Sequence, residues 1–237
     1  FCLSRGLGDV YKRQDKKTFT VGFDAEYPPY GYMDENGEYT GFDLELAEAV
    51  CKLEGWELVK KPLNWDSKDM ELNSGSIDCI WNGFTMNGRE DDYTFSTPYV
   101  DNSQVIVVAE KSGIDTLEDL AGKTVGVQAA SAALDLLKSE EEGGQKKLAD
   151  TFGALNEFAD YNTAFTELQA GALDALAIDV GVANYQIKSR GEGYKILDET
   201  LNTEQYAIGF KKGNQELCDV VLSLIHISEP TRQAEIS

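Results

Sequence analysis

Residues 78–89, which read Asp-Cys-Ile-Trp-Asn-Gly-Phe-Thr-Met-Asn-Gly-Arg, bring together side chains that can bind a small ligand. The apolar start of this stretch has the length of a buried strand, and the chain then breaks at Asn82-Gly83 into a polar loop. Asn82 and Thr85 can donate hydrogen bonds, and Gly83 lets a ligand approach the backbone. Arg89 presents a planar guanidinium that suits a carboxylate.

A strand that runs into a glycine-containing loop is typical of ligand sites in open α/β sheets, where the crevice lies beyond the carboxyl ends of the strands. Residues 78–89 therefore favour a binding site in an α/β protein. The alternative is a surface loop whose Arg89 pairs with one of the many acidic residues of the chain.

Both ends of the chain look like translated sequencing adapter rather than parts of the fold. Parts of the two ends can be encoded by opposite strands of one DNA segment that resembles a transposase adapter. We therefore treat residues 1–14 and 222–237 as adapter-like artefacts. Cys2 and His226, the only histidine, fall inside them, so we expect no His-based catalytic triad and no metal site.

The composition is strongly acidic, with 42 Asp and Glu against 21 Lys and Arg and a net charge of −21. Such a chain is not built to attract nucleic acid or an anionic membrane. No apolar run reaches the length of a membrane span, and a signal peptide or lipid-anchor cysteine would lie upstream of Asp15. Cys51, Cys79 and Cys218 lack metal-ligand spacing and are expected to be buried, so no cofactor is predicted.

Two sequence patterns of the first half recur in the same order in the second half. Residues 20–23, Thr-Val-Gly-Phe, return as Thr-Val-Gly-Val at 124–127. The pattern Leu-x-x-Gly-x-Ile-Asp-x-Ile at 72–80 returns with Leu in place of Ile at 168–176. Taken together, the ordered pair predicts two similar βα lobes.

The hydrophobic periodicity places strands and helices alternately along both halves. Strands are predicted at 18–23, 56–60, 77–81, 104–109, 124–127, 154–158, 194–197 and 205–210. Helices are predicted at 41–53, 70–74 and 180–189 and from residues 131, 163 and 213. For the first helix, Asp43 is expected as the cap. Its expected apolar stripe is Leu46, Ala49, Val50 and Leu53.

The order of these elements predicts a domain organisation with two crossings between lobes. The first lobe is expected at 15–108, the second at 109–202, and a return to the first at 203–221, which the adapter-like segment truncates. A small ligand is expected in a deep cleft between the two lobes.

Several motifs together resemble the extracellular solute-binding proteins of ABC transporters, family 3, which bind amino acids. The resemblance covers nearly all of residues 18–213 and includes the second-lobe motif Leu-x-Asp-Leu-x-Gly-Lys-Thr-Val-Gly-Val at 117–127. The remaining motifs are Asp24-x-x-Tyr27-x-Pro29-Tyr30, Gly41-Phe-Asp43-x-Glu45-Leu, Gly83-x-Thr85 with Arg89, Phe95-Ser-x-Pro-Tyr99, and Leu173-Asp174-Ala175 followed by Asp179. The resemblance implies a periplasmic-binding-protein-like fold of type II, in which each lobe is a βα sandwich around a mostly parallel sheet.

The resemblance also implies a function and partners. The chain is expected to capture a free L-amino acid and deliver it to ABC permease subunits, without catalysis of its own. A monomer outside the cytoplasm is expected, either in the periplasm or as a lipoprotein on a Gram-positive cell surface. Any lipid anchor would belong to sequence absent from this chain.

Roles in ligand binding follow from the matching positions. Arg89 would bind the ligand α-carboxylate, with hydroxyl groups of Thr85 and Ser131 and backbone amides near Ser131 as further donors. Asp179, from the second lobe, would accept from the α-ammonium, assisted by the Gly83 carbonyl. Binding to both lobes would favour the closed state.

The side-chain pocket is expected to be lined by Asp24, Tyr27 and Trp65. Asp24 and Glu26 favour a ligand with a polar or cationic side chain, although either could point to solvent. Trp65 could instead belong to the core of the lobe, and Tyr27 could simply cover the neighbouring Pro-Pro turn.

Other assignments also have alternatives. Asp179 and Ser131 could serve only as helix caps. The gap before Arg89 is one residue shorter than the family spacing Gly-x-Thr-x-Thr-x-x-Arg.

Two other functions use the same fold. One is the sensing domain of a receptor. The other is a cyclohexadienyl or arogenate dehydratase, in which Asp24 or Glu26 would have to act as the acid.

Overall fold

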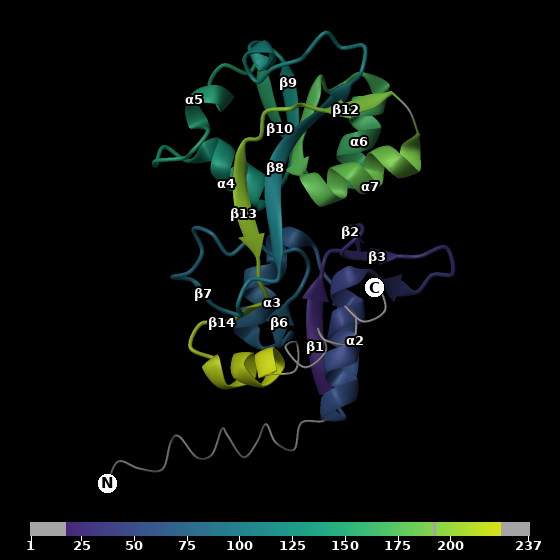
Figure 1. Cartoon of the computed structure of the whole chain (residues 1–237), viewed down its shortest axis with the longest axis vertical. Coiled ribbons are helices and arrows are strands. Elements are labelled where there is room, and N and C mark those ends of the chain that lie inside the picture. The colour runs from purple at the N-terminus through teal and green to yellow at the C-terminus, as the bar shows by residue number, and fades with distance from the viewer. Residues whose placement is uncertain (1–17, 192, 224–237) are drawn as a thin grey trace, which may run out of the picture.

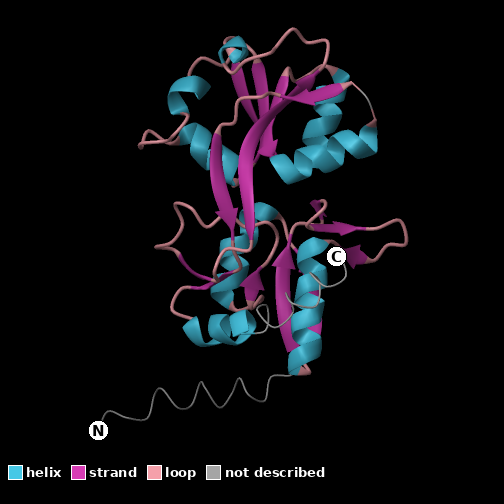
Figure 2. Cartoon of the chain, in the orientation of Figure 1, coloured by secondary structure: helices cyan, strands magenta, loops and turns pink. Residues whose placement is uncertain are grey.

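The computed structural model describes residues 18–191 and 193–223 and consists of two lobes joined by two strands (Figure 1). Each lobe contains a mixed β-sheet covered by helices, as the colouring by secondary structure makes plain (Figure 2). This arrangement confirms the predicted α/β class and the two-lobed architecture. Almost all of both adapter-like ends, with Cys2 and His226, lies outside the described residues.

The first lobe is built on a five-stranded sheet. Its elements are β1 (Thr18–Phe23), α2 (Phe42–Glu54), β5 (Glu57–Pro62), η1 (Trp65–Ser67), α3 (Lys68–Ser74), β6 (Cys79–Ile80), β7 (Tyr93–Phe95) and β14 (Gly209–Lys211). The strand order is β5-β1-β6-β14-β7. Strands β1, β5 and β6 run parallel, whereas β14 is antiparallel to both of its neighbours. The predicted mostly parallel sheet is therefore a mixed one.

Helices cover both faces of this sheet. Phe19, Val21 and Phe23 alternate along β1 toward the face that carries α2 and the helix at 215–223. On the opposite face, Leu72 of α3 packs with Ile77, Ile80 and Trp65. The three cysteines Cys51, Cys79 and Cys218 are buried and free, in agreement with their expected role as small apolar residues.

The sequence-based description of α2 was wrong about its cap and about most of its buried stripe, of which only Val50 is buried. Gly41 is the N-cap, and Asp43 lies inside the first turn with its side chain buried. The buried face consists of Asp43, Leu44, Ala47, Val50 and Cys51, whereas Leu53 is exposed. Both sets of positions satisfy a 3.6-residue period, so only the docking of the helix on β1 decides between them.

The second lobe has a sheet of six strands. Its elements are η2 (Glu118–Leu120), β9 (Thr124–Gln128), α4 (Ala132–Lys138), α5 (Lys146–Ala149), β10 (Ala154–Phe158), α6 (Tyr161–Ala170), β11 (Ala175–Asp179), α7 (Val180–Arg190) and β12 (Tyr194–Ile196). The strands β10, β9 and β11 run parallel, as expected from βα units. Helices α6 and α7 pack on one face of the sheet and α4 packs on the other.

Two antiparallel strands, β8 (Val100–Ala109) and β13 (Asn202–Tyr206), cross between the lobes side by side (Figure 1). Tyr206 lies opposite Val100 and Asn202 lies opposite Gln104, beyond which β8 joins the sheet of the second lobe. We therefore propose that the second lobe begins within β8, earlier than the boundary at 108/109 drawn from the sequence. The strand predicted at 205–210 is two strands, because β13 ends at the crossing and β14 joins the other sheet.

A small three-stranded sheet projects from the first lobe toward the second. It consists of β2 (Glu26–Tyr27), β3 (Gly31–Met33) and β4 (Tyr39–Thr40), in the order β2-β3-β4. The Tyr32 ring lies 5.7 Å from the Tyr185 ring of α7, so this sheet reaches the other lobe. Residues between β1 and β3 thus come from the first lobe but face the cleft.

The corrected register of α2 can be tested with a matched pair of variants. Leu44 is fully buried, whereas Leu53 on the same helix is 54% exposed. We expect Leu44→Ala to lower the free energy of unfolding by about 2–5 kcal/mol, because it leaves a cavity under the helix. Leu53→Ala should change it by less than about 0.5 kcal/mol. Urea denaturation of both variants measures the difference, and equal losses would contradict the observed register.

Candidate functional site: a cavity between the lobes

A small cavity lies between the two lobes. Seven of the nine residues predicted to contact a ligand line it. The lining residues are Tyr27, Trp65, Gly83, Thr85 and Arg89 from the first lobe and Gln128, Ser131, Ala132 and Asp179 from the second. Residues distant in the sequence are thus assembled into one site by the contact between lobes.

Arg89 enters the cavity from the loop after β6, and its guanidinium is already engaged. One terminal nitrogen donates to Asp135 Oδ2 of α4 at 2.7 Å, and the other lies 3.4 Å from the Thr85 carbonyl oxygen. The guanidinium also covers the Phe84 ring, 5.1 Å from its centroid. The Arg89 side chain is 13% exposed and that of Asp135 64%, so this ion pair connects the lobes at the edge of the cavity.

Asp179 ends β11 and is buried in a dense set of hydrogen bonds. Its Oδ1 accepts from Asn102 Nδ2 at 2.8 Å, from Gln104 Nε2 at 2.7 Å and from the Tyr206 hydroxyl at 2.6 Å. Its side chain makes no capping bond to α7, although the residue occupies the N-cap position. The cap alternative for Asp179 therefore finds no support in the geometry, and the carboxylate is held toward the cavity.

Aromatic rings form much of the cavity wall. Tyr27 and Tyr206 approach through their hydroxyl oxygens at 3.3 Å, and the ring of Tyr161 lies 6.0 Å from that of Tyr27. Burial, and next the nearby Asp179 carboxylate, raise the pKa of each of these three hydroxyls well above its usual value, so they stay neutral. Trp65 both lines the cavity and packs on Phe84, so its two predicted roles coexist.

The two hydroxyls predicted to bind a ligand carboxylate have partners within the protein. Thr85 Oγ1 donates to Glu204 Oε1 at 2.8 Å. Ser131 Oγ donates to the Gln128 carbonyl at 2.7 Å and accepts from the Leu134 amide at 3.2 Å as the N-cap of α4. Both hydroxyl groups therefore line the cavity but already donate their hydrogen bonds to acceptors within the protein.

Gly83 occupies the left-handed region of backbone conformation, with φ of +56°, and lies close to two aromatic rings. A Cβ here would lie 3.0 Å from atoms of both Tyr27 and Tyr206. The Gly83 amide donates to Asp43 Oδ2 at 2.5 Å, so the buried first turn of α2 fixes this loop. Burial raises the pKa of Asp43 to about 7, and the hydrogen bond from Gly83 opposes the shift.

Asp24 and Asn82 were predicted as ligand contacts, but they do not line the cavity. Asp24 lies behind Gln128 and accepts from its Nε2 at 2.6 Å. Burial raises the pKa of Asp24 to about 6, against hydrogen bonds from Glu26 and Gln128 that lower it. Asn82 is buried beside Gly31, at which an added Cβ would lie 2.5 Å from Asn82 Oδ1. The structure thus directs Asn82 toward the small sheet rather than the cavity.

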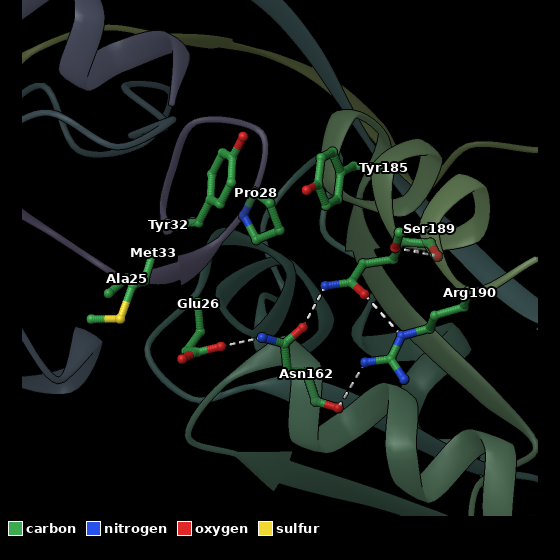
Figure 3. Close-up of a pocket in the computed structure, with 10 residues that line it drawn as sticks. Ala25, Glu26, Pro28, Tyr32, Met33, Asn162, Tyr185, Ser189 and Arg190 are labelled. Carbon is green, nitrogen blue, oxygen red and sulfur yellow. Dashed lines mark hydrogen bonds between the residues drawn. The ribbon is translucent and has the colours of Figure 1, made fainter. Parts of the chain in front are cut away.

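A second, larger hollow lies where the small sheet meets α6 and α7 (Figure 3). Glu26 accepts from the Asn162 amide across the lobes, and Gln186 Nε2 donates to Asn162 Oδ1 at 2.6 Å. Arg190 Nε in turn donates to Gln186 Oε1 at 2.9 Å. This chain of bonds joins the lobes on the side of Glu26, which therefore points away from the first cavity.

Sequence reasoning missed several residues that shape the site. The most important are Asn102, Gln104, Gln128, Asp135 and Glu204. Gln104 and Gln128 stand at ends of apolar strand runs, where a buried polar side chain signals a site. Asp135 and Glu204 carried no such signal, because acidic residues are abundant throughout this chain.

The described residues contain no group of three or more His, Cys, Asp or Glu side chains that could hold a metal ion. In the same part of the chain, no helix has the length and apolar character needed to cross a bilayer.

The raised pKa of Asp43 predicts a pH-dependent stability. Folding favours the protonated carboxyl, so this stabilisation is complete below the unfolded pKa and is lost as the pH rises toward about 7. Asp43→Asn removes the titration but keeps an acceptor for Gly83. We therefore compare the free energy of unfolding of Asp43→Asn with that of the unmodified chain at each pH. Relative to the unmodified chain, the variant should become more stable by roughly 2 to 3 kcal/mol between pH 5 and pH 8.

Urea denaturation at the two pH values measures this gain. The exposed carboxylate of Asp219 provides the control, since Asp219→Asn should leave the difference between the two pH values unchanged. A constant gap between Asp43→Asn and the unmodified chain would refute the prediction.

Comparison with known proteins identifies relatives over almost the whole chain. The family model of bacterial extracellular solute-binding proteins, family 3, matches residues 19–231. The L-cystine-binding protein TcyJ of Escherichia coli K12 is 30% identical over 217 residues, which are 90% of this chain and 78% of that protein. The arginine-binding extracellular protein ArtP of Bacillus subtilis is 33% identical over 218 residues, 90% of this chain and 82% of that protein.

Solved structures agree with this relationship. An ABC uptake transporter substrate-binding protein from Streptococcus pneumoniae with bound histidine has a TM-score of 0.85 and 33% identity, covering 92% of this chain and 89% of that chain. An ancestral arginine-binding protein bound to arginine has a TM-score of 0.80 and 37% identity, covering 90% and 93%. These relatives are binding proteins, which agrees with the expectation that this chain is not an enzyme. The chain belongs to family 3 of the bacterial extracellular solute-binding proteins.

Proposed function

We propose that this chain is the substrate-binding component of an ABC importer and captures a free L-amino acid between its lobes. The observation that carries the proposal is that Arg89 from the first lobe and Asp179 from the second line the same cavity. A zwitterionic ligand can satisfy both, its carboxylate on the guanidinium and its ammonium on the carboxylate. The names of the relatives, which bind cystine, arginine and histidine, support the same ligand class.

In this proposal the α-carboxylate takes the side of Arg89 that Asp135 does not use. Asp135 holds one terminal nitrogen of the guanidinium, which leaves donors on the other side for a ligand. The Gly83 carbonyl and Asp179 receive the ammonium. Thr85 contributes its hydroxyl oxygen as an acceptor, since its hydroxyl group already donates a hydrogen bond to Glu204.

The ligand side chain is proposed to be polar. Gln128 lines the cavity and connects it to the Asp24 carboxylate behind it. Trp65 and Tyr27 offer flat faces on which an aliphatic or cationic group can pack. Asn82 retains a role in shaping the loop rather than in contacting the ligand.

Ligand binding and lobe closure are coupled in this scheme, because the carboxylate and ammonium partners belong to different lobes. A bound ligand stabilises the closed state by its differential affinity for it. We infer that the closed form is the one recognised by the permease subunits of the importer. The protein would work outside the cytoplasm as a monomer, in the periplasm or as a cell-surface lipoprotein.

A thermal-shift panel tests the ligand class. The panel contains the common L-amino acids with L-cystine, and sugars serve as the negative set. A ligand at about a hundred times its dissociation constant stabilises the folded chain by roughly 2.7 kcal/mol, which is a readable rise in the melting midpoint. We expect at least one L-amino acid to raise the midpoint and no sugar to do so.

Variants of the two charged groups then localise the site. Arg89→Ala and Asp179→Asn should each weaken binding by at least about 30-fold in calorimetric titrations, because each leaves an opposite charge without its partner. Lys138→Ala is the matched control, since Lys138 only forms an exposed ion pair with Glu157. A panel in which no amino acid shifts a cooperative melt would overturn the proposed function.

A further inference from the structure

A second buried carboxylate lies directly behind the proposed ammonium site. Glu204 comes from the crossing strand β13 and is 4% exposed, as is Asp179. Glu204 does not line the cavity but accepts a hydrogen bond from the hydroxyl group of Thr85, which does.

Two side-chain amides tie the carboxylates together. Asn102 Nδ2 lies 2.8 Å from both Asp179 Oδ1 and Glu204 Oε1. Gln104 Nε2 repeats the arrangement, 2.7 Å from Asp179 Oδ1 and 2.8 Å from Glu204 Oε1. Because they share these nitrogens, the two oxygens lie within about 6 Å of each other, where like charges oppose one another's ionisation.

The surroundings do not neutralise two negative charges. Among the described residues, no Lys or Arg nitrogen lies within 4.0 Å of either carboxylate. Arg89, the cation on the neighbouring loop, is paired with Asp135. Asp101 on the adjacent strand β8 adds a further acidic group, although it is exposed and holds Gln205.

Neutral groups complete the environment of the pair. The hydroxyls of Tyr27, Tyr161 and Tyr206 face it, and their raised pKa values keep them uncharged. Burial, and after it the charge of Asp179, raise the pKa of the Glu204 carboxyl, against hydrogen bonds from Thr85, Asn102 and Gln104 that lower it. The geometry and the environment therefore agree that one net negative charge is the stable state of the pair without a cation.

We propose that Glu204 is a positioning residue of the ammonium site, which carries a proton in the empty cleft beside the Asp179 carboxylate and loses that proton when a ligand ammonium binds. The proton leaves to solvent, and the ligand ammonium replaces its charge, so the pair ends doubly ionised beside one cation. This inference rests on the proposed function. It adds that ligand binding is linked to proton release through a residue of the crossing strand.

The linkage fixes the direction of the pH dependence. A proton and an ammonium compete for the same pair, so binding weakens as the pH falls below the pKa of the pair. The dissociation constant should rise by up to about tenfold for each pH unit in that range and level off above it.

Calorimetric titration in buffers of different ionisation enthalpy counts the protons released. The probes are L-arginine and L-glutamine, neither of which titrates between pH 5 and pH 7.5. For each probe that binds, we expect the unmodified chain to release up to one proton per ligand at the acid end of the range from pH 5 to pH 7.5, and fewer as the pH rises. Glu204→Gln mimics the protonated carboxyl and keeps an acceptor for Thr85, so it should still bind with a dissociation constant independent of pH.

Asp24→Asn is the matched control, because Asp24 is the other buried acid near the cavity, behind Gln128. It should retain the proton release. Loss of release in Asp24→Asn but not in Glu204→Gln would overturn the proposal. Binding by the unmodified chain without proton release between pH 5 and pH 7.5 would also overturn the proposal. This result needs no variant and leaves the proposed function intact. Absence of binding by every probe would instead overturn the proposed function, and this inference with it.

Discussion

The structure depends on the burial of opposite charges in a cleft that two lobes close together. Arg89 and Asp179 come from different lobes and meet at one cavity, and each is held by partners of its own. A buried charge without a partner is costly, so neither group could stay in this position alone. The charged groups proposed to receive a ligand are therefore also the groups that require the neighbouring polar residues.

The crossing strands connect this requirement to the motion of the lobes. Asn102 and Gln104 lie on β8, and Glu204 and Tyr206 lie opposite on β13. The residues that fix the Asp179 carboxylate thus belong to the segments that any opening of the cleft must bend or twist. The proposed ammonium site and the crossing strands share the same hydrogen bonds, so a change of charge at Asp179 would act directly on the connection between the lobes.

Two further acidic residues near the site are buried, although burial of a carboxyl group is unfavourable. The buried carboxyl group of Asp43 accepts the hydrogen bond that holds the Gly83 loop, and that of Asp24 accepts the bond that orients Gln128. Both have raised pKa values because burial outweighs their hydrogen bonds. Local departures of this kind from an apolar core are expected at functional positions. Their concentration around one cleft is independent support for its role.

The amino-acid sequence by itself determined the α/β class, the two lobes and most of the cavity lining. Strand periodicity, glycine-containing turns and the repeated motifs are local features, so they can be read directly from neighbouring residues of the sequence. Tyr27, Gly83, Thr85, Arg89 and Asp179 belong to the quoted motifs, Trp65 and Ser131 were expected from the family resemblance, and all seven line the cavity.

Only the tertiary structure decided which acids matter and which way the side chains point. The docking of α2 selected Leu44 over Leu53, and the crossing of the strands divided 202–211 between two sheets. Glu204 and Asp135 look like any of the 42 acidic residues until the lobes meet. The importance of Glu204 comes from burial, and both residues act through partners more than 40 residues away in the chain, which no local pattern records.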